Sequence, residues 1–460
     1  MNRHVKVPTH CGGKDESGSS DVAFSSRPVR YFNGAIRYAV EDLSLNAFGN
    51  ALGHTRSYGN QMFEGSPGSN GNGWFLELSP VLLFDADGSV GMVGHVHQPH
   101  WFAPEADGYK ALLGDATALE RDDANQQYIV TDREGVKTHF FGEGSPYKGA
   151  FKGRVDRNGA VTLAAYNSRQ QMESFVTTSG SQTAGFHFEY YHGSGGSTAD
   201  QYKVVTSRVN GQDVRRARYE YHGRGESGGA QGDLKSALVE QYDPATGAWF
   251  EVAKSHYRYY TTFASPGFPS GLKYIVGPEA YSRMVAAGLQ PETASDSQLA
   301  EYADFYFEYD IYQRVTHEAV NGGAYTHLFS YAESGNPDDF NTWAVKTVET
   351  LPDGNRNVAY SNYAGQVILK SFQEGDGEHF TYFQFDHEGK GVLRAESSAV
   401  AGYDENQPGL VTLHENKGLI HTYEYYTNPA DAGYAPGYLK HEGVQTRISQ
   451  MNFQVSAGQI

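Results

Sequence analysis

The sequence has little of several features that identify common protein classes. It contains one cysteine, Cys11, so no internal disulfide can form and a small disulfide-stapled secreted domain is excluded. No stretch approaches the roughly 18 consecutive apolar residues of a transmembrane helix. Residues 1–21 are polar and lack the apolar core of a signal peptide, so we expect no Sec signal.

Positive charge is also scarce. The chain has 36 lysines and arginines against 54 acidic residues, a net charge of −18. The densest basic group is Arg215, Arg216 and Arg218. Nucleic acids and anionic membranes bind clustered basic side chains, so we expect neither as a partner.

Glycine and aromatic residues are abundant instead. There are 54 glycines, 33 tyrosines and 25 phenylalanines but 6 methionines, a profile that favours short strands joined by tight turns. Turn signals recur between alternating stretches at 33–34, 87–88, 134–135 and 158–159. The sequence therefore predicts an all-β fold.

Composition divides the chain into three parts. Residues 1–26 are rich in glycine and serine and are predicted to be a disordered arm. Residues 27–182 are predicted to form an N-terminal β domain, and residues 183–460 a series of repeated strands. A short helical insertion is expected around 278–303, where Pro278 opens one helix, Gly288 ends it and Ser295 caps a second.

A loose repeat begins near residue 183. Each copy is an alternating aromatic strand, often with Tyr-Asp or Tyr-Glu, followed by a turn and a second strand. A repeat of this kind buries its aromatic face against its neighbours. The copies cover residues 186–193, 217–225, 256–262, 305–323, 327–335, 357–372, 382–397 and 421–427.

The copy at 305–323 resembles the YD repeat of Rhs proteins, approximately Tyr-Asp-x-x-Gly-Arg-Val. Tyr309–Asp310 is followed by Gln313–Arg314–Val315. A later copy keeps Phe385–Asp386 and Gly389, and another keeps Tyr360 with Gly365–Val367.

The opening block, residues 28–60, also resembles the N-terminal block of Rhs proteins. It contains Pro28–Val29, Asp42–Leu43 and Arg56–Ser57–Tyr58, which correspond to the family's Pro-Val, Asp-Leu and Arg-Ser-Tyr. Residues 271–310 are similar to long YD-repeat proteins. The resemblance thus covers nearly all of the chain after residue 27.

The resemblance implies a continuous sheet that spirals into a complete or partial β-shell around a C-terminal polypeptide, as in Tc toxin complexes and teneurins. It implies a non-enzymatic scaffold that is secreted or at the cell surface. Its partner would be its own downstream segment or a toxin cargo. The family's Asp-Pro-rich self-cleavage region has no counterpart here, because Asp243–Pro244 lies mid-chain in a turn pattern.

Three motifs resemble catalytic or metal-binding sites, and for each we expect a structural role instead. Residues 225–229 fit the G-x-S-x-G pattern around Ser227, but no helical pattern follows, so we expect a loop. His95 and His97 would share one face of a strand, as in a two-histidine metal site, whereas His100 follows Pro99 and is expected to leave the strand.

Asp85 and Asp87 resemble the start of an EF-hand loop but lack its later ligands, so we expect a hairpin turn. Residues 68–73 lack the lysine and helix of a phosphate loop. The 54 acidic residues include no pair whose spacing marks a glycosidase. We therefore predict no catalytic, metal-binding or cofactor-binding residue, and no cofactor.

The aromatic residues of the repeats leave one alternative function open. Exposed rings on a β surface could stack on sugars, which would make the chain a carbohydrate-binding or adhesion module. Alternation places them on one repeated face, so we expect most of them to pack between strands. The residues concerned are Tyr190, Tyr221, Tyr259, Tyr309, Tyr331, Tyr360, Phe385 and Tyr425.

Overall fold

The computed structural model describes residues 17–48, 50–61, 70–94, 99–191, 200–407, 409–426 and 438–446. It is 53% strand and 4% helix, which confirms the all-β prediction. None of the described helices is long and apolar enough to cross a membrane. The chain divides into two compact units: unit 1 holds the described residues from 25 to 329, and unit 2 holds residues 17–24 and those from 330 onward.

Unit 1 contains two small antiparallel sheets near its N-terminus. The first, which we call the inner sheet, is formed by β1 (Tyr38–Ala47), β2 (Asn50–Tyr58) and β3 (Trp74–Leu76). The second is formed by β4 (Val81–Phe84), β5 (Val90–Val93), β6 (His100–Glu105) and β7 (Gly108–Ala111).

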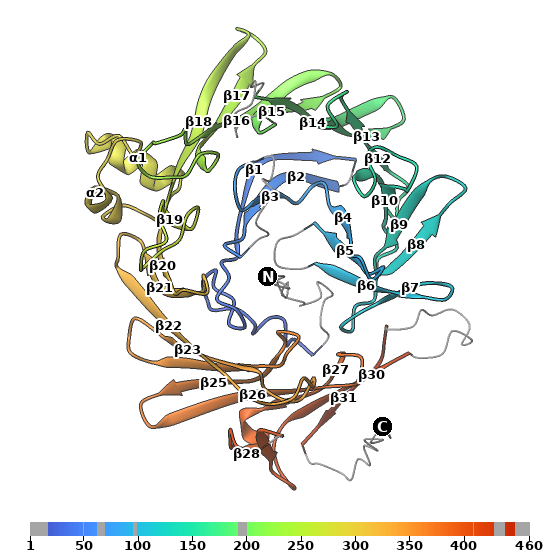
Figure 1. Ribbon diagram of the computed structural model, residues 1–460, viewed down its shortest axis with the longest axis vertical. Helices are drawn as coiled ribbons and strands as arrows, with labels where there is room; N and C mark the ends of the chain where they lie inside the picture. The colour runs from blue at the N-terminus through green and yellow to red at the C-terminus, as the bar shows by residue number, and fades with distance from the viewer. Residues whose placement is uncertain are drawn as a thin grey trace. The chain divides into compact units, whose positions relative to one another are not determined.

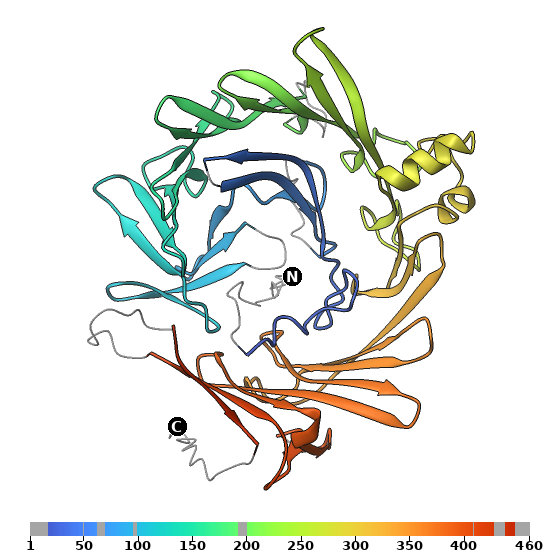
Figure 2. The ribbon, with the colours of Figure 1, turned by 180° about the vertical axis from the view of Figure 1, so that it is seen from behind.

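The third sheet of unit 1, which we call the outer sheet, is larger, and paired strands in it are antiparallel neighbours in chain order. It curves as an arc in Figures 1 and 2, with the inner sheet against its concave side. The unit boundary falls within its last strand, β22. Its strands are β8 (Ala118–Asp122), β9 (Gln127–Thr131), β10 (Lys137–Phe141), β11 (Phe151–Val155), β12 (Val161–Tyr166), β13 (Met172–Ser179), β14 (Gln182–Tyr190), β15 (Tyr202–Val209), β16 (Gln212–Tyr221), β17 (Leu234–Asp243), β18 (Ala248–Tyr259), β19 (Leu272–Val276), β20 (Phe305–Tyr309), β21 (Val315–Val320) and β22 (Tyr325–Glu333).

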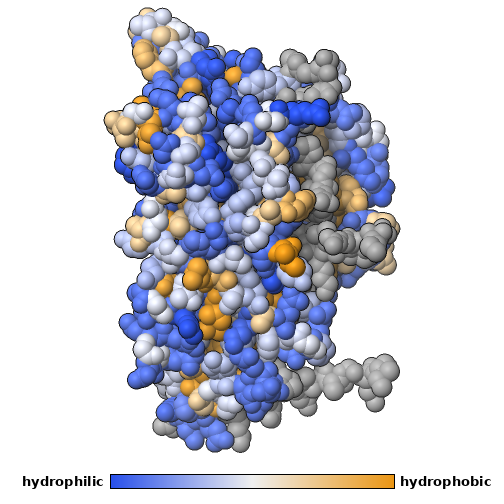
Figure 3. All heavy atoms as spheres, turned by 60° about the vertical axis from the view of Figure 1, so that its left-hand side comes forward, coloured by the Kyte–Doolittle hydropathy of each residue, from blue (hydrophilic) through white to orange (hydrophobic). Residues whose placement is uncertain are grey.

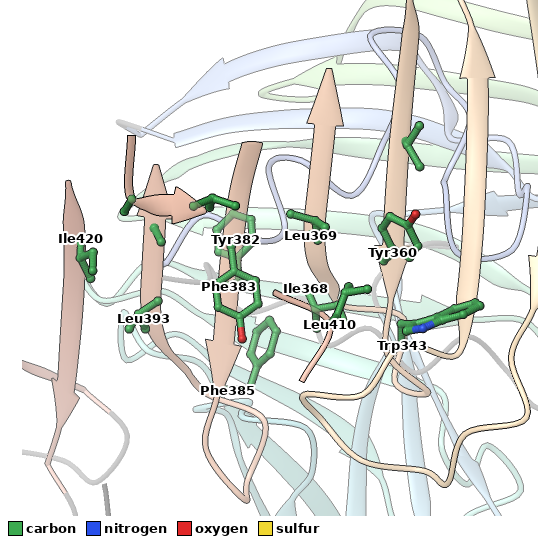
Figure 4. Packing of buried hydrophobic residues seen from close by; sticks show 14 residues of the cluster. Trp343, Tyr360, Ile368, Leu369, Tyr382, Phe383, Phe385, Leu393, Leu410 and Ile420 are labelled. Carbon is green, nitrogen blue, oxygen red and sulfur yellow. The ribbon is translucent and has the colours of Figure 1, made fainter. Parts of the chain in front are cut away.

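Unit 2 is built on an antiparallel sheet with a separate hairpin beside it. The sheet contains β23 (Val345–Thr350), β24 (Arg356–Ser361), β25 (Val367–Glu374), β26 (Gly377–Phe385), β27 (Gly391–Glu396), β30 (Ile420–Tyr425) and β31 (Leu439–Gln445). The short helix η1 (Ser397–Ala399) leads into the hairpin of β28 (Val400–Tyr403) and β29 (Val411–Leu413). Figure 4 shows the core of this unit, in which rings and aliphatic side chains from successive strands pack together.

The predicted helical insertion is confirmed. Helix α1 (Pro278–Ala286) begins at the predicted proline, and Gly288 follows it with a φ of +78°. Helix α2 (Asp296–Ala300) is capped by Ser295, whose side chain accepts a hydrogen bond from the backbone of Gln298. Both helices pack on β19, where their apolar side chains form a core with the sheet.

The predicted turns also lie where the sequence places them. Asp87–Gly88 joins β4 to β5, Glu134–Gly135 joins β9 to β10, and Asn158–Gly159 joins β11 to β12. The turn at Asn33–Gly34 brings Val29 opposite Ile36 as an isolated bridge, and regular strands begin at β1.

Two predicted boundaries differ from the structure. Residues 17–24 belong to the predicted arm, yet Ser17 and Ser19 are buried and the Ser19 hydroxyl donates to the carbonyl of Val367 at 3.0 Å. Small side chains such as serine can pack closely against strands, so a serine-rich composition does not by itself indicate disorder. Residues 1–16, including Cys11, lie outside the described residues. The predicted boundary at 182/183 falls at the start of β14, which pairs with β13, and the units divide after residue 329.

The surface shown in Figure 3 is dominated by hydrophilic residues, with apolar residues in small separate groups. The most exposed large apolar side chains include Ile311 at 89%, Phe263 at 79% and Tyr312 at 65%. All three lie in loops or turns of unit 1. Scattered exposed residues of this kind need no special explanation.

Candidate functional site

A five-residue turn explains the aspartate of the Tyr-Asp motif. The Asp310 carboxylate accepts hydrogen bonds from the backbone N–H groups of Tyr312 at 2.9 Å and Arg314 at 3.0 Å. The backbone N–H of Asp310 donates to the carbonyl of Arg314, which closes the turn between β20 and β21. The fourth residue, Gln313, has a φ of +63°, a conformation that favours glycine.

The same backbone closure recurs at other hairpins, and its fourth residue has a positive φ each time. Aspartate or asparagine at the first position can satisfy turn N–H groups with its side chain. The repeated motif therefore encodes hairpin geometry. Turns of this type begin at Asp85, Asp132, Asp156, Asn167, Asp310, Asn362 and Asp386.

Five tyrosines at strand ends form hydrogen bonds to the neighbouring strand. Each hydroxyl donates to a backbone carbonyl at the start of the strand before it in the sheet, because antiparallel strands place those ends side by side. A hydroxyl bonded in this way lets the ring remain buried. The pairs are Tyr166 with Phe151, Tyr190 with Met172, Tyr221 with Tyr202, Tyr309 with Leu272, and Tyr425 with Gly391.

The eight aromatic residues singled out as possible sugar-stacking groups are therefore mainly packed. Five are at most 6% exposed: Tyr190, Tyr259, Tyr309, Tyr360 and Phe385. The other three are half-buried. The five buried rings cannot offer a face to a ligand from solvent, which favours the packing interpretation for them.

A buried region rich in polar side chains lies where the inner sheet of unit 1 meets the concave face of the outer sheet (Figure 1). Alternate side chains of β2 point toward that face. His54 Nε2 lies 2.7 Å from the hydroxyl of Tyr219 on β16, and Arg56 Nη2 donates to the hydroxyl of Tyr257 on β18 at 2.7 Å. All four side chains are at most 1% exposed.

The next two alternate residues continue this line of contacts. The Tyr58 hydroxyl donates to the carbonyl of Ser270 at 2.9 Å and accepts from the N–H of Leu272 at 3.0 Å. Asn60 Nδ2 donates to the carbonyl of Gln313 at 2.6 Å. Every second residue of this stretch thus contacts a later element of the outer sheet.

The rest of the inner sheet strengthens this attachment. Trp74, at the start of β3, donates its indole N–H to the Tyr259 hydroxyl at 2.9 Å. Asn72 donates to the carbonyl of Gly232 and to the carboxylate of Asp233. Burial, the largest influence, raises the pKa of Asp233 to about 6, although hydrogen bonds from Asn72, Ser270 and the backbone of Ala230 act to lower it.

One buried ion pair belongs to the inner sheet itself. Arg56 Nε lies 2.6 Å from Asp42 Oδ2, with side chains 0% and 4% exposed. The guanidinium also lies over the Trp74 ring at 4.5 Å. Burial, the largest single influence, acts to lower the pKa of Arg56. The Asp42 carboxylate, with the hydroxyls of Tyr257 and Tyr219, outweighs burial and holds that pKa well above its usual value. The guanidinium is therefore charged within the protein.

His54 is held in its neutral form. The Tyr219 hydroxyl donates to Asp42 at 2.7 Å, so its oxygen is left to accept from His54 Nε2–H. His54 Nδ1 has no hydrogen-bond partner among the described residues, and the rings of Phe186 and Phe188 lie against the imidazole. Burial lowers the pKa of His54 to about 4, the nearby Arg56 also lowers it, and Asp42 partly opposes this.

The residues considered for chemistry do not gather into a site. Ser227 is exposed in the loop between β16 and β17, with no helix after it. His95, His97 and residues 68–69 lie outside the described residues. His100 was expected to leave the strand but begins β6, where its Nδ1 lies 2.5 Å from Asp115.

Other candidates have local structural roles. Asp85 and Asp87 form the β4–β5 hairpin turn, as expected. Asp243 starts the turn between β17 and β18 and accepts from the N–H of Ala245 and the hydroxyl of Thr246. Within the described ranges, no three His, Cys, Asp or Glu residues lie in a position to hold a metal ion.

The sequence alone did not assign a role to the residues that contact the concave face, which are His54, Arg56, Tyr58 and Asn60. The sequence indicated Asp42, Arg56 and Tyr58 only through their match to the N-terminal block of Rhs proteins. A further signal was present, since His54, Arg56 and Tyr58 stand at every second position and so share one face of a strand.

Comparisons with known proteins identify no family. No model of a known protein family matches the chain, and no curated protein matches it either. Solved structures give low-scoring similarities. A porin-like protein from Bacteroides uniformis shares 11% identity over 81% of this chain and 96% of its own, with a TM-score of 0.18.

A crystal structure of TcdB2-TccC3 shares 10% identity over 85% of this chain, with a TM-score of 0.19, and the chain spans 20% of its length. The tricorn protease shares 10% identity over 83% of this chain and 43% of its own, with a TM-score of 0.19. At these scores the similarities carry no argument about function.

Proposed function

We propose that the chain is a non-enzymatic scaffold of the Rhs/YD-repeat kind, part of a β-shell that encloses or displays a C-terminal polypeptide. The observation that carries this proposal is the concave face of unit 1, which already holds a stretch of polypeptide through buried side chains. A curved wall that can bind one polypeptide segment in this way is suited to holding another. The repeated Tyr-Asp hairpin turns, and the hydrogen bonds from tyrosine hydroxyls to neighbouring strands, give such a wall a repeating structure.

The proposal includes an absence of catalysis. Ser227 is exposed in a loop. His54 and His256, whose pKa values burial lowers to about 4 and about 3, are at most 1% exposed. In this proposal the partner is a downstream segment of the protein or a toxin cargo. The protein would be secreted or displayed at the cell surface, as the Rhs resemblance implies.

Carbohydrate binding has weaker support. That hypothesis depended on exposed repeat aromatics, and five of those eight rings are buried. Two of the buried tyrosines, Tyr190 and Tyr309, also donate their hydroxyls to backbone carbonyls. A glycan array that gave no binding at millimolar sugar would dispose of it.

Protection from protease tests the enclosure. A permanently unfolded polypeptide is fused after residue 460 of the full chain, and the same polypeptide is fused to an unrelated folded carrier as the control. We expect the segment on this chain to survive at least ten times longer under a non-specific protease. Equal digestion of the two fusions would contradict enclosure.

A further inference from the structure

We propose that the concave face from β16 to the β20–β21 turn is a sequence-selective strand-binding site. Its ligand is an extended polypeptide that presents a hydrogen-bonding side chain, chiefly a donor, at every second residue. Residues 54–60 of the chain are the resident ligand. This inference rests on the proposed function and specifies what kind of polypeptide the wall accepts.

The spacing of the contacts supports this site. Alternate residues of a strand lie on one face about 7 Å apart. Along β2 and the two residues after it, these side chains contact β16, then β18, then the start of β19, then the β20–β21 turn. The ligand strand therefore crosses the strands of the wall, and successive parts of the wall each contact one side chain.

The chemistry of the wall indicates which side chains it accepts. At Tyr257 a hydroxyl accepts from a guanidinium, and at Ser270 and Gln313 backbone carbonyls accept from a phenol and an amide. These acceptors carry no formal charge. The charge of Arg56 is balanced by Asp42, which lies on β1 and so arrives with the ligand.

The way in which β2 is held makes recognition depend on its sequence. When a peptide adds to a sheet edge, backbone hydrogen bonds supply the affinity and any strand can satisfy them. Here β2 is held on the wall by side-chain hydrogen bonds. An acidic side chain at position 60 would face the Gln313 carbonyl without a proton to offer, and a buried unsatisfied polar group is costly. At position 56 it would lie beside the buried Asp42 carboxylate, and the two negative charges would repel each other.

A peptide-binding experiment tests this site. The host is the full-length chain carrying Arg56→Glu, in which the resident strand no longer fits. The probe is a fluorescent peptide of residues 38–61, which carries both Arg56 and its counter-charge Asp42. We expect saturable binding to this host at least tenfold tighter than to the unmodified chain, whose site is occupied. Peptides with Arg56→Glu or Asn60→Asp should bind at least tenfold more weakly. A Thr55→Val peptide, changed at an intervening position, should bind like the original.

Equal affinity of the original and acidic peptides would overturn the proposal, as would absence of binding to a host that keeps a β-type circular dichroism spectrum. If that host does not fold, full-length Asn60→Asp provides the second measurement. Hydrogen exchange should then be faster at residues 38–60 and unchanged in β24–β27, and unchanged exchange at residues 38–60 would overturn selectivity. Protease protection of the fused segment reports the proposed function separately, so either idea can fail alone.

Discussion

Replacing Arg56 with methionine should destabilise unit 1 severely. Methionine keeps much of the length and apolar contact of the side chain but removes the charge that Asp42 faces. Because the Asp42 side chain is 4% exposed, its carboxylate would be left buried. Among the residues that the structure describes, it would keep the hydrogen bond from the Tyr219 hydroxyl. Breaking a buried ion pair from one side costs about 3–5 kcal/mol.

Urea-dependent hydrogen exchange, followed peptide by peptide, measures this effect in unit 1 separately from unit 2. We expect residues 38–60 to lose about 3–5 kcal/mol of protection. The matched control is Arg121→Met, which removes an arginine paired with Asp123 at 48% and 69% side-chain exposure. Exposed pairs contribute about 0–1 kcal/mol, so the control should stay close to the unmodified protein.

A second variant tests the cause of that loss. If it comes from the unpaired Asp42 carboxylate, then Asp42→Asn combined with Arg56→Met should be more stable than Arg56→Met alone. An Arg56→Met protein within about 1 kcal/mol of the unmodified protein, or a control equally affected, would refute the reasoning.

Three further predictions concern single residues. Gln313→Gly should raise the unfolding free energy by about 1 kcal/mol, because glycine adopts its φ of +63° without strain; no gain in urea denaturation would contradict this. Tyr309→Phe should cost about 1 kcal/mol by removing the hydrogen bond that its hydroxyl donates to the Leu272 carbonyl, and an unchanged denaturation midpoint would count against it. Burial lowers the pKa of His54 in the folded protein to about 4. Its contribution to the free energy of unfolding is therefore fully present above pH 6.5 and is lost as the pH falls toward 4. His54→Gln should therefore remove roughly 3 kcal/mol of that pH dependence, and identical pH profiles would argue against it.

Features that depend on neighbouring residues could be predicted from the sequence. Pro278 and Ser295 start the two helices because the first-turn geometry and the capping hydrogen bonds are local. The Tyr309–Asp310 motif marked a hairpin because Asp310 bonds to backbone groups within four residues. The membership of the Rhs/YD family stays a prediction.

The concave-face site could not be predicted in the same way. Arg56 meets Tyr257 across 201 positions and Asn60 meets Gln313 across 253, so no local pattern links them. Alternation along β2 indicated a shared face but not what that face contacts. The burial of Ser19 likewise involves a distant partner, the Val367 carbonyl that its hydroxyl contacts.

A double-mutant cycle between Arg56 and Tyr257 tests most directly whether the concave face holds a polypeptide by its side chains. The cycle compares Arg56→Met, Tyr257→Phe and the double variant by the hydrogen-exchange stability of residues 38–60. The 2.7 Å bond from the guanidinium to the phenol oxygen predicts a coupling energy of about 1.5–3 kcal/mol. A coupling energy indistinguishable from zero would mean that this contact does not hold the inner sheet, and the account of a strand-binding wall would be wrong.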